Sequence, residues 1–175
     1  MGAENCETPN KDHCMTMIHW QQYSIEERLQ LLDITSAEKN LPRLAVEKDW
    51  WVTIVLKALS KTQYADLLSF KGGTSLSKGW SLIERFSEDI DIAIKREGRF
   101  SINGTSNTQL AKVRRAARHY VIKELPLELE EIFHGFGVHD FDIDAETSKM
   151  DEGNGYELRA DTHPSVIYVN YRSIL

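Results

Sequence analysis

Residues 70–92 read FKGGTSLSKGWSLIERFSEDIDI, and this stretch carries most of the chemistry that the chain offers. The apolar residues 67–70 predict a short strand that ends at Gly72 and Gly73. Two adjacent glycines permit a tight turn and let the backbone approach a ligand closely. Residues 75–86 then predict a helix with one apolar face, and residues 89–95 alternate between polar and apolar positions as a strand does.

The diglycine turn is a candidate phosphate site. The next helix is expected to begin at Thr74 or Ser75, so its free N–H groups would face the same point as the turn. Lys71 and Lys78 bracket the turn and could neutralise phosphate charge. The alternative is a glycine turn with a capped helix and solvated lysines. The usual P-loop, GxxxxGK[ST], does not occur in the chain.

Asp89 and Asp91 are candidate metal ligands because alternation along a strand puts both carboxylates on one face. Two like charges so close together repel each other unless cations neutralise them. Mg²⁺ binds such hard oxygen ligands, and pairs of metal ions promote in-line displacement at phosphorus. An Asp-x-Asp alone is often the polar face of an edge strand. Its place one helix after a diglycine turn favours phosphate-and-metal chemistry.

The N-terminal half predicts two helices. Ser24 and Glu27 form a capping box that starts the first. Pro42 precedes a longer, mostly buried helix whose apolar residues recur every fourth position from Val46 to Ala58.

The C-terminal half predicts helices and strands in alternation. Residues 108–124 predict a helix, and a short acidic helix follows Pro126. Residues 138–145 and 165–171 predict strands, with a third possible at 156–160. This order favours an α+β fold with a mixed sheet.

Composition is that of an ordinary globular protein, with 175 residues, 41% hydrophobic and 27% charged. No run is long enough to span a bilayer, which predicts a cytoplasmic protein without membrane contact. Residues 1–12 predict a loose tail, and Cys6 and Cys14 are interpreted as ordinary reduced thiols.

A net charge of −6 argues against a broadly basic surface. A local basic patch nevertheless stands on the 108–124 helix. It is either a solvated helix face or a contact for an RNA backbone. Its residues are Lys112, Arg114, Arg115, Arg118 and Lys123.

The residues FKGGTSLSK at 70–78 and RFSEDIDI at 85–92 resemble the AbiEii/AbiGii toxin family, a branch of the DNA polymerase beta-like nucleotidyltransferases. The segment VEKDWWV at 46–52 is similar to the family as well, and the resemblance covers about residues 25–175. It implies a polymerase beta-like core that uses Mg²⁺ and a nucleoside triphosphate. It also implies a toxin of abortive phage infection with a separate antitoxin, acting on RNA, tRNA above all.

By that resemblance, residues 72–75 fall at the nucleotide and Asp89 and Asp91 at the metal ions. Residues 1–23 are then a flexible tail and lead-in, and 24–175 are the nucleotidyltransferase domain, expected to be cut short before a C-terminal helical region. The third carboxylate of the superfamily would lie beyond residue 175. The candidates within the chain are Asp140, Asp142 and Asp144, for which a solvated strand face is the favoured interpretation.

Two other functions stay open. A chain that lacks the third carboxylate would be a non-catalytic nucleotide- or protein-binding domain. Antibiotic-modifying relatives in the superfamily suggest transfer to a small molecule instead. Labelled nucleotide appearing on RNA, on a small acceptor or on neither distinguishes the three.

Overall fold

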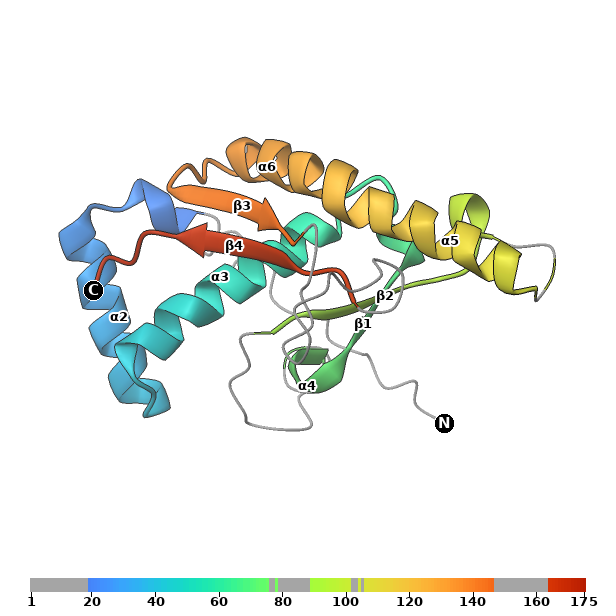
Figure 1. Cartoon of the computed structure of the whole chain (residues 1–175). Helices are drawn as coiled ribbons and strands as arrows, with labels where there is room; N and C mark the ends of the chain where they lie inside the picture. Colours follow the sequence, from blue (N-terminus) through green and yellow to red (C-terminus); the bar gives the residue numbers. More distant parts are fainter. Residues whose placement is uncertain (1–18, 76–77, 79–88, 102–103, 105, 147–163) are drawn as a thin grey trace, which may run out of the picture.

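The structure is a computed structural model that describes residues 19–75, 78, 89–101, 104, 106–146 and 164–175 (Figure 1). The expected tail, most of the helix expected at 75–86, and the strand expected at 156–160 lie outside these residues. In chain order the elements are η1 (His19–Gln22), α2 (Ile25–Lys39), α3 (Arg43–Leu59), η2 (Ala65–Leu67), β1 (Leu68–Lys71), α4 (Gly72–Thr74), β2 (Asp91–Ile94), η4 (Gly98–Phe100), α5 (Asn107–His119), η5 (Tyr120–Glu124), α6 (Leu125–Gly135), β3 (Phe141–Ala145) and β4 (Ile167–Tyr171).

The capping box at the start of α2 forms as predicted. The N–H of Glu27 donates to the Ser24 hydroxyl at 3.2 Å, and the N–H of Ser24 donates to the Glu27 carboxylate at 2.8 Å. The helix ends at Asn40, which adopts the left-handed conformation (φ 52°) that asparagine tolerates at a helix C-terminus. The chain then turns at Pro42 into α3.

The core lies between α3 and α6. The helical periodicity of α3 buries Trp50, Trp51, Ile54 and Ala58 as expected. Aromatic contacts tie distant segments to this helix, since the Trp51 ring stacks on Tyr171 of β4 with centroids 4.6 Å apart. The remaining buried residues of this core are Leu59, Phe100, Tyr120, Leu125, Leu129, Phe133 and Val138.

Folded structure begins before residue 24. Residues His19–Gln22 form a 3₁₀ turn, and the ring of Trp20 packs on Trp50 with centroids 6.0 Å apart. Trp20 is partly buried against the core, so the residues expected as lead-in contact the domain at this point.

Helices α5 and α6 form one continuous rod (Figure 1). The sequence predicted a break before Pro126. Proline cannot donate a hydrogen bond to the preceding turn, and the chain accommodates it with a wide π turn over residues 120–124. The N–H of Leu125 accordingly donates to the carbonyl of Tyr120, five residues earlier.

The fold is α+β, as expected. Its described strands form two separate antiparallel sheets rather than one mixed sheet. One pairs β1 with β2, placing Lys71 opposite Asp91 and Phe70 opposite Ile92. The other pairs β3 with β4, placing Ile143 opposite Val169.

The segment after β2 packs against the rest of the fold through Arg99 and Phe100. Phe100 is only 1% exposed. The neighbouring Arg99 guanidinium donates two hydrogen bonds, of 2.5 and 2.6 Å, to the carboxylate of Glu124. His119 lies 2.9 Å from the same carboxylate. These contacts attach the loop to the π turn.

This network predicts a pH effect on stability. The Arg99 hydrogen bonds hold the pKa of Glu124 below its usual 4.5. The ionised carboxylate therefore stabilises the fold above pH 4.5, and this contribution is lost as the pH falls through the lowered pKa. We expect Glu124→Gln to reduce the free energy of unfolding at pH 7, measured by urea titration. The difference from wild type should shrink in acid, and a difference that grows in acid would contradict the assignment.

Candidate active site

Pairing of β1 with β2 brings the diglycine turn beside the aspartate pair. Lys71 is the last residue of β1 and lies opposite Asp91, the first residue of β2. Gly72 follows at once, so the turn and the carboxylate meet at the same end of this sheet. Lys71 and Asp91 are both exposed. Opposite charges directly across an antiparallel pair attract each other.

Gly72 is required by two features of this turn. Its φ of 71° lies in the left-handed region, which strains residues that carry a side chain. A Cβ at this position would also overlap the carboxylate of Asp91. The Asp91 carboxylate therefore occupies the space that a side chain at 72 would fill. At Gly73, by contrast, a Cβ would meet no atom of the described residues within 4 Å.

The turn starts a helix two or three residues earlier than expected. Element α4 begins at Gly72, and the N–H of Ser75 donates to the Gly72 carbonyl. The backbone at Thr74 belongs to this first turn, and Ser75 is buried, with 8% of its surface exposed. Asp89 lies just before β2 and is exposed. Of the predicted residues, Lys71, Gly72 and Asp91 thus lie together, and Ser75 is turned into the protein.

The side chain of Lys78 is directed at α3. Its ammonium group lies 2.8 Å from Asp49 Oδ1 and donates to Thr53 Oγ1 at 2.9 Å. Both partners are on α3, one helical turn apart. Lys78 also lines a small cavity with Phe70 and Ile92, on the apolar face of the β1–β2 sheet. In this structure it anchors the chain after the turn to α3.

This difference between the two lysines predicts different effects of removing them. We expect Lys78→Met to lower the free energy of unfolding by about 1 kcal/mol, because a partly exposed ion pair and a hydrogen bond are lost. Lys71→Met should lower the free energy of unfolding by less than about 0.5 kcal/mol, because its cross-strand partner Asp91 is exposed, and it should raise the KM for nucleotide. Urea titration and initial rates measure the two effects. A raised KM with unchanged stability in Lys78→Met would show that Lys78 leaves Asp49 to bind phosphate.

The paired carboxylates suit a divalent cation. Their oxygens are hard ligands, and the missing side chain at Gly72 leaves Asp91 directly against backbone. Within the described residues, no three His, Cys, Asp or Glu side chains gather closely enough to hold a metal ion by themselves.

The aspartates considered for a third ligand stand in the other sheet. Asp140, Asp142 and Asp144 are exposed, and Asp144 accepts a hydrogen bond of 3.1 Å from Asn170 on β4. Strand β3 pairs with β4, not with β2.

The basic residues Lys112, Arg114 and Arg115 are exposed on α5, as a surface patch requires.

The sequence indicated a supporting role for α3 only through the resemblance at 46–52, and it did not show which groups the acidic residues of this helix hold. Asp49 holds Lys78, and the nearly fully buried Glu47 accepts hydrogen bonds from the Ser173 hydroxyl at 2.7 Å and the Ile174 N–H at 3.0 Å. The sequence signal for Glu47 was its position on the apolar face of a predicted helix. A carboxylate that is buried there needs hydrogen-bond partners.

Comparison with known protein families places the chain among the nucleotidyltransferases. The family described as nucleotidyl transferase AbiEii toxin, type IV TA system, matches residues 54–165, more than half of the chain. The chain therefore belongs to the AbiEii toxin family of nucleotidyltransferases, which confirms the resemblance seen in residues 70–92. Comparison with curated proteins gave no match, and neither did comparison with solved structures. No helix among the described residues is long and apolar enough to cross a membrane.

Proposed function

We propose that the protein transfers a nucleotide from a nucleoside triphosphate to an RNA, with tRNA the first acceptor to test, and that the reaction needs Mg²⁺. The observation that carries this proposal is the contact between the Asp91 carboxylate and the backbone of Gly72. This contact supports the proposal because the carboxylate oxygens would hold the metal ion beside backbone N–H groups that would bind the triphosphate.

The proposed reaction is a displacement at the α-phosphorus. An acceptor hydroxyl oxygen forms the new bond to phosphorus while the bond to the bridging oxygen breaks, pyrophosphate leaves with the electron pair, and the hydroxyl proton passes to solvent. Mg²⁺, when bound, neutralises phosphate charge and activates the hydroxyl. Asp89 and Asp91 would hold it. The turn at 72–74 would orient the triphosphate through its N–H groups, assisted by Lys71.

The basic patch on α5 is the proposed RNA contact. Lys112, Arg114 and Arg115 present positive charge to solvent on a protein whose net charge is −6. Arg118 belongs to the same helix, where its guanidinium donates to the Ser165 hydroxyl at 3.4 Å. Clustered arginine and lysine on one helix are suited to successive phosphates of a nucleic acid backbone. We infer a cytoplasmic toxin of abortive infection, controlled by an antitoxin.

The test is transfer of radiolabel from each α-labelled triphosphate to total RNA with Mg²⁺, with EDTA as the metal-free control. We expect label in the tRNA band, lost with EDTA. Label on a small molecule only would move the acceptor to the small-molecule class. Label on neither, from a folded protein that still binds nucleotide, would support the non-catalytic alternative.

A further inference from the structure

A small polar cluster on α3 binds the lysine that follows the diglycine turn. The Lys78 ammonium lies 2.8 Å from Asp49 Oδ1 and donates to Thr53 Oγ1 at 2.9 Å. The Thr53 hydroxyl in turn donates to the backbone carbonyl of Asp49 at 2.8 Å. A threonine hydroxyl has only one proton, so this oxygen offers Lys78 its lone pairs. Two acceptors one helical turn apart therefore define the position of the ammonium group.

The helix that carries these two acceptors is held by the core. Trp50 and Ile54, which follow Asp49 and Thr53 directly along α3, are buried. Close packing of such side chains sets the rotation of the helix about its axis, and with it the direction in which the two acceptors face. An ion pair that starts from a packed helix can position the segment at its other end.

Lys78 lies behind the sheet that carries the proposed metal ligands. It lines a cavity of about 350 Å³ together with Phe70 and Ile92, which face each other across β1 and β2. The next pair along these strands is Lys71 and Asp91. Successive residues of a strand point to opposite faces and are about 3.3 Å apart. The cluster therefore supports one face of the sheet end whose other face presents Asp91.

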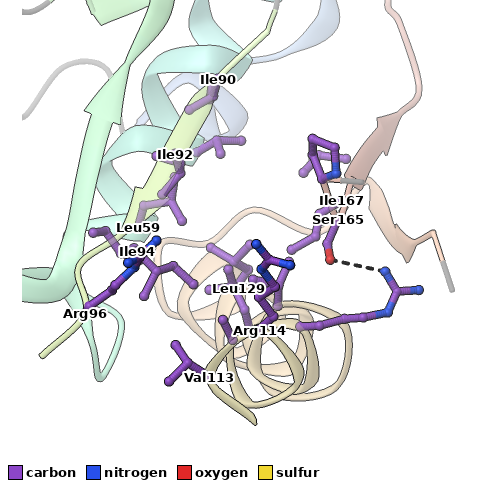
Figure 2. A pocket seen from close by; sticks show the side chains of 18 residues that line it. Leu59, Ile90, Ile92, Ile94, Arg96, Val113, Arg114, Leu129, Ser165 and Ile167 are labelled. Carbon is purple, nitrogen blue, oxygen red and sulfur yellow. Dashed lines mark hydrogen bonds between the residues drawn. The ribbon is translucent and has the colours of Figure 1, made fainter. Parts of the chain in front are cut away.

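Among the described residues, packing leaves this supported face of the sheet partly open. Figure 2 shows Ile90, Ile92 and Ile94 along one side of a second cavity, of about 750 Å³. Ile92 is 36% exposed. A side chain beside open space has few neighbouring atoms to hold it in place. Polar contacts therefore contribute more to positioning this strand than they do in a closely packed core.

The opposite end of the sheet has a separate attachment. The Lys95 ammonium donates to the backbone carbonyl of Asp66 at 2.9 Å, beside η2 and away from the diglycine turn. Lys95 directly follows β2. A lysine thus supports each end of the sheet, and Lys78 is the one at the end where the turn and the aspartate meet.

We propose that Asp49 is a positioning residue for nucleotide transfer and that it acts through Lys78. Together with Thr53 it holds the ammonium group, which supports the sheet end where the Gly72 turn meets the Asp91 carboxylate. The N–H groups of the turn and the carboxylate would then keep the spacing that a triphosphate and its metal ion need. This inference rests on the proposed function, to which it adds a residue that supports the site from behind.

Substitutions of the two acceptors test the proposal by steady-state kinetics. Asp49→Asn keeps the size of the side chain and removes the charge that attracts Lys78. We expect the KM for nucleotide to rise about tenfold while kcat stays within about threefold, because the displaced turn binds the triphosphate less well. Asp49→Glu and Thr53→Ser keep the charge and the hydroxyl, so each should stay within about threefold of the wild-type KM.

A double-mutant cycle shows whether Asp49 acts through Lys78. If it does, Asp49→Asn should add nothing to the rise in KM that Lys78→Met already causes. Asp33→Asn is the matched control for the aspartate, because Asp33 pairs with Arg43 at the start of the same helix. Lys95→Met is the control for the lysine. Both controls should leave the KM for nucleotide unchanged.

Amide hydrogen exchange reports on the position of the sheet without any reaction. Exchange at the amide of Ser75, which donates to the Gly72 carbonyl, and at the amides of β2 should become at least about tenfold faster in Asp49→Asn. In Asp33→Asn it should stay at the wild-type rate. Circular dichroism verifies that each variant is folded.

Three results would overturn the inference. The first is a wild-type KM in Asp49→Asn when the wild-type protein transfers nucleotide. The second is faster exchange in Asp49→Asn with an unchanged KM, which would make the cluster purely structural. The third is a Lys78→Met variant with raised KM and unchanged stability, which would show that Lys78 leaves Asp49 to bind phosphate. A wild-type protein that neither binds nor transfers nucleotide would instead overturn the proposed function, and this inference with it, before any variant is assayed.

Discussion

Asp91→Asn should abolish nucleotide transfer while leaving the fold intact. The substitution keeps the size of the side chain against Gly72 and removes the negative charge that a divalent cation needs. Loss of metal-assisted charge stabilisation is worth several kcal/mol, so the rate should fall at least about a thousandfold. Asp89→Asn should behave in the same way. The measurement is transfer of label to RNA at saturating nucleotide.

Asp142→Asn is the matched control for this prediction. Asp142 is another exposed strand aspartate, in the sheet that does not contain β2. Its variant should retain wild-type activity. An Asp142 variant as inactive as the Asp91 variant would place the third carboxylate within this chain and would contradict its interpretation as a solvated strand face.

Gly72→Ala should have the second largest effect. The added methyl group meets the Asp91 carboxylate, and a left-handed φ of 71° costs an alanine about 1–2 kcal/mol. We expect unfolding to become easier by about that amount. We also expect activity to fall about a hundredfold, because small displacements of catalytic groups have effects of that order.

Gly73→Ala separates the two possible roles of the glycines. A Cβ at 73 meets no atom of the described residues within 4 Å, so stability should be unchanged or slightly improved. If glycine is needed only to admit the Asp91 carboxylate, activity should stay within about threefold of wild type. Equal loss of activity at both positions, with only Gly72→Ala destabilised, would show that the nucleotide itself approaches the backbone at 73.

Local sequence signals predicted the secondary structure near the site well. The Ser24 capping box, the buried stripe of α3, and the strands on both sides of the diglycine segment depend on spacings of two to four residues, which a sequence displays directly. The sequence also assigned Gly72 and Asp91 to one site, although a predicted helix separates them along the chain. It did not predict that the strands carrying them pair in antiparallel fashion.

Long-range contacts were not predictable in this way. Lys78 and Asp49 are far apart along the chain, and the sequence offers several other carboxylates as partners for a lysine. The same holds for Arg99 and Glu124. The split into two sheets also depends on how strand edges meet across the fold, which alternation within each strand does not encode.

The wide turn at Tyr120–Glu124 has a consequence for the basic helix that precedes it. Each residue of an α-helix turns the side-chain direction by about 100° around the helix axis. One extra residue in a turn therefore rotates all preceding side chains of the helix about that axis. Core contacts of Leu125 and Leu129 fix the rotation of α6. The five-residue spacing at the turn then determines where Arg114 and Arg118 point. A single deletion there would turn both arginines to another side of the helix, although neither arginine had been replaced.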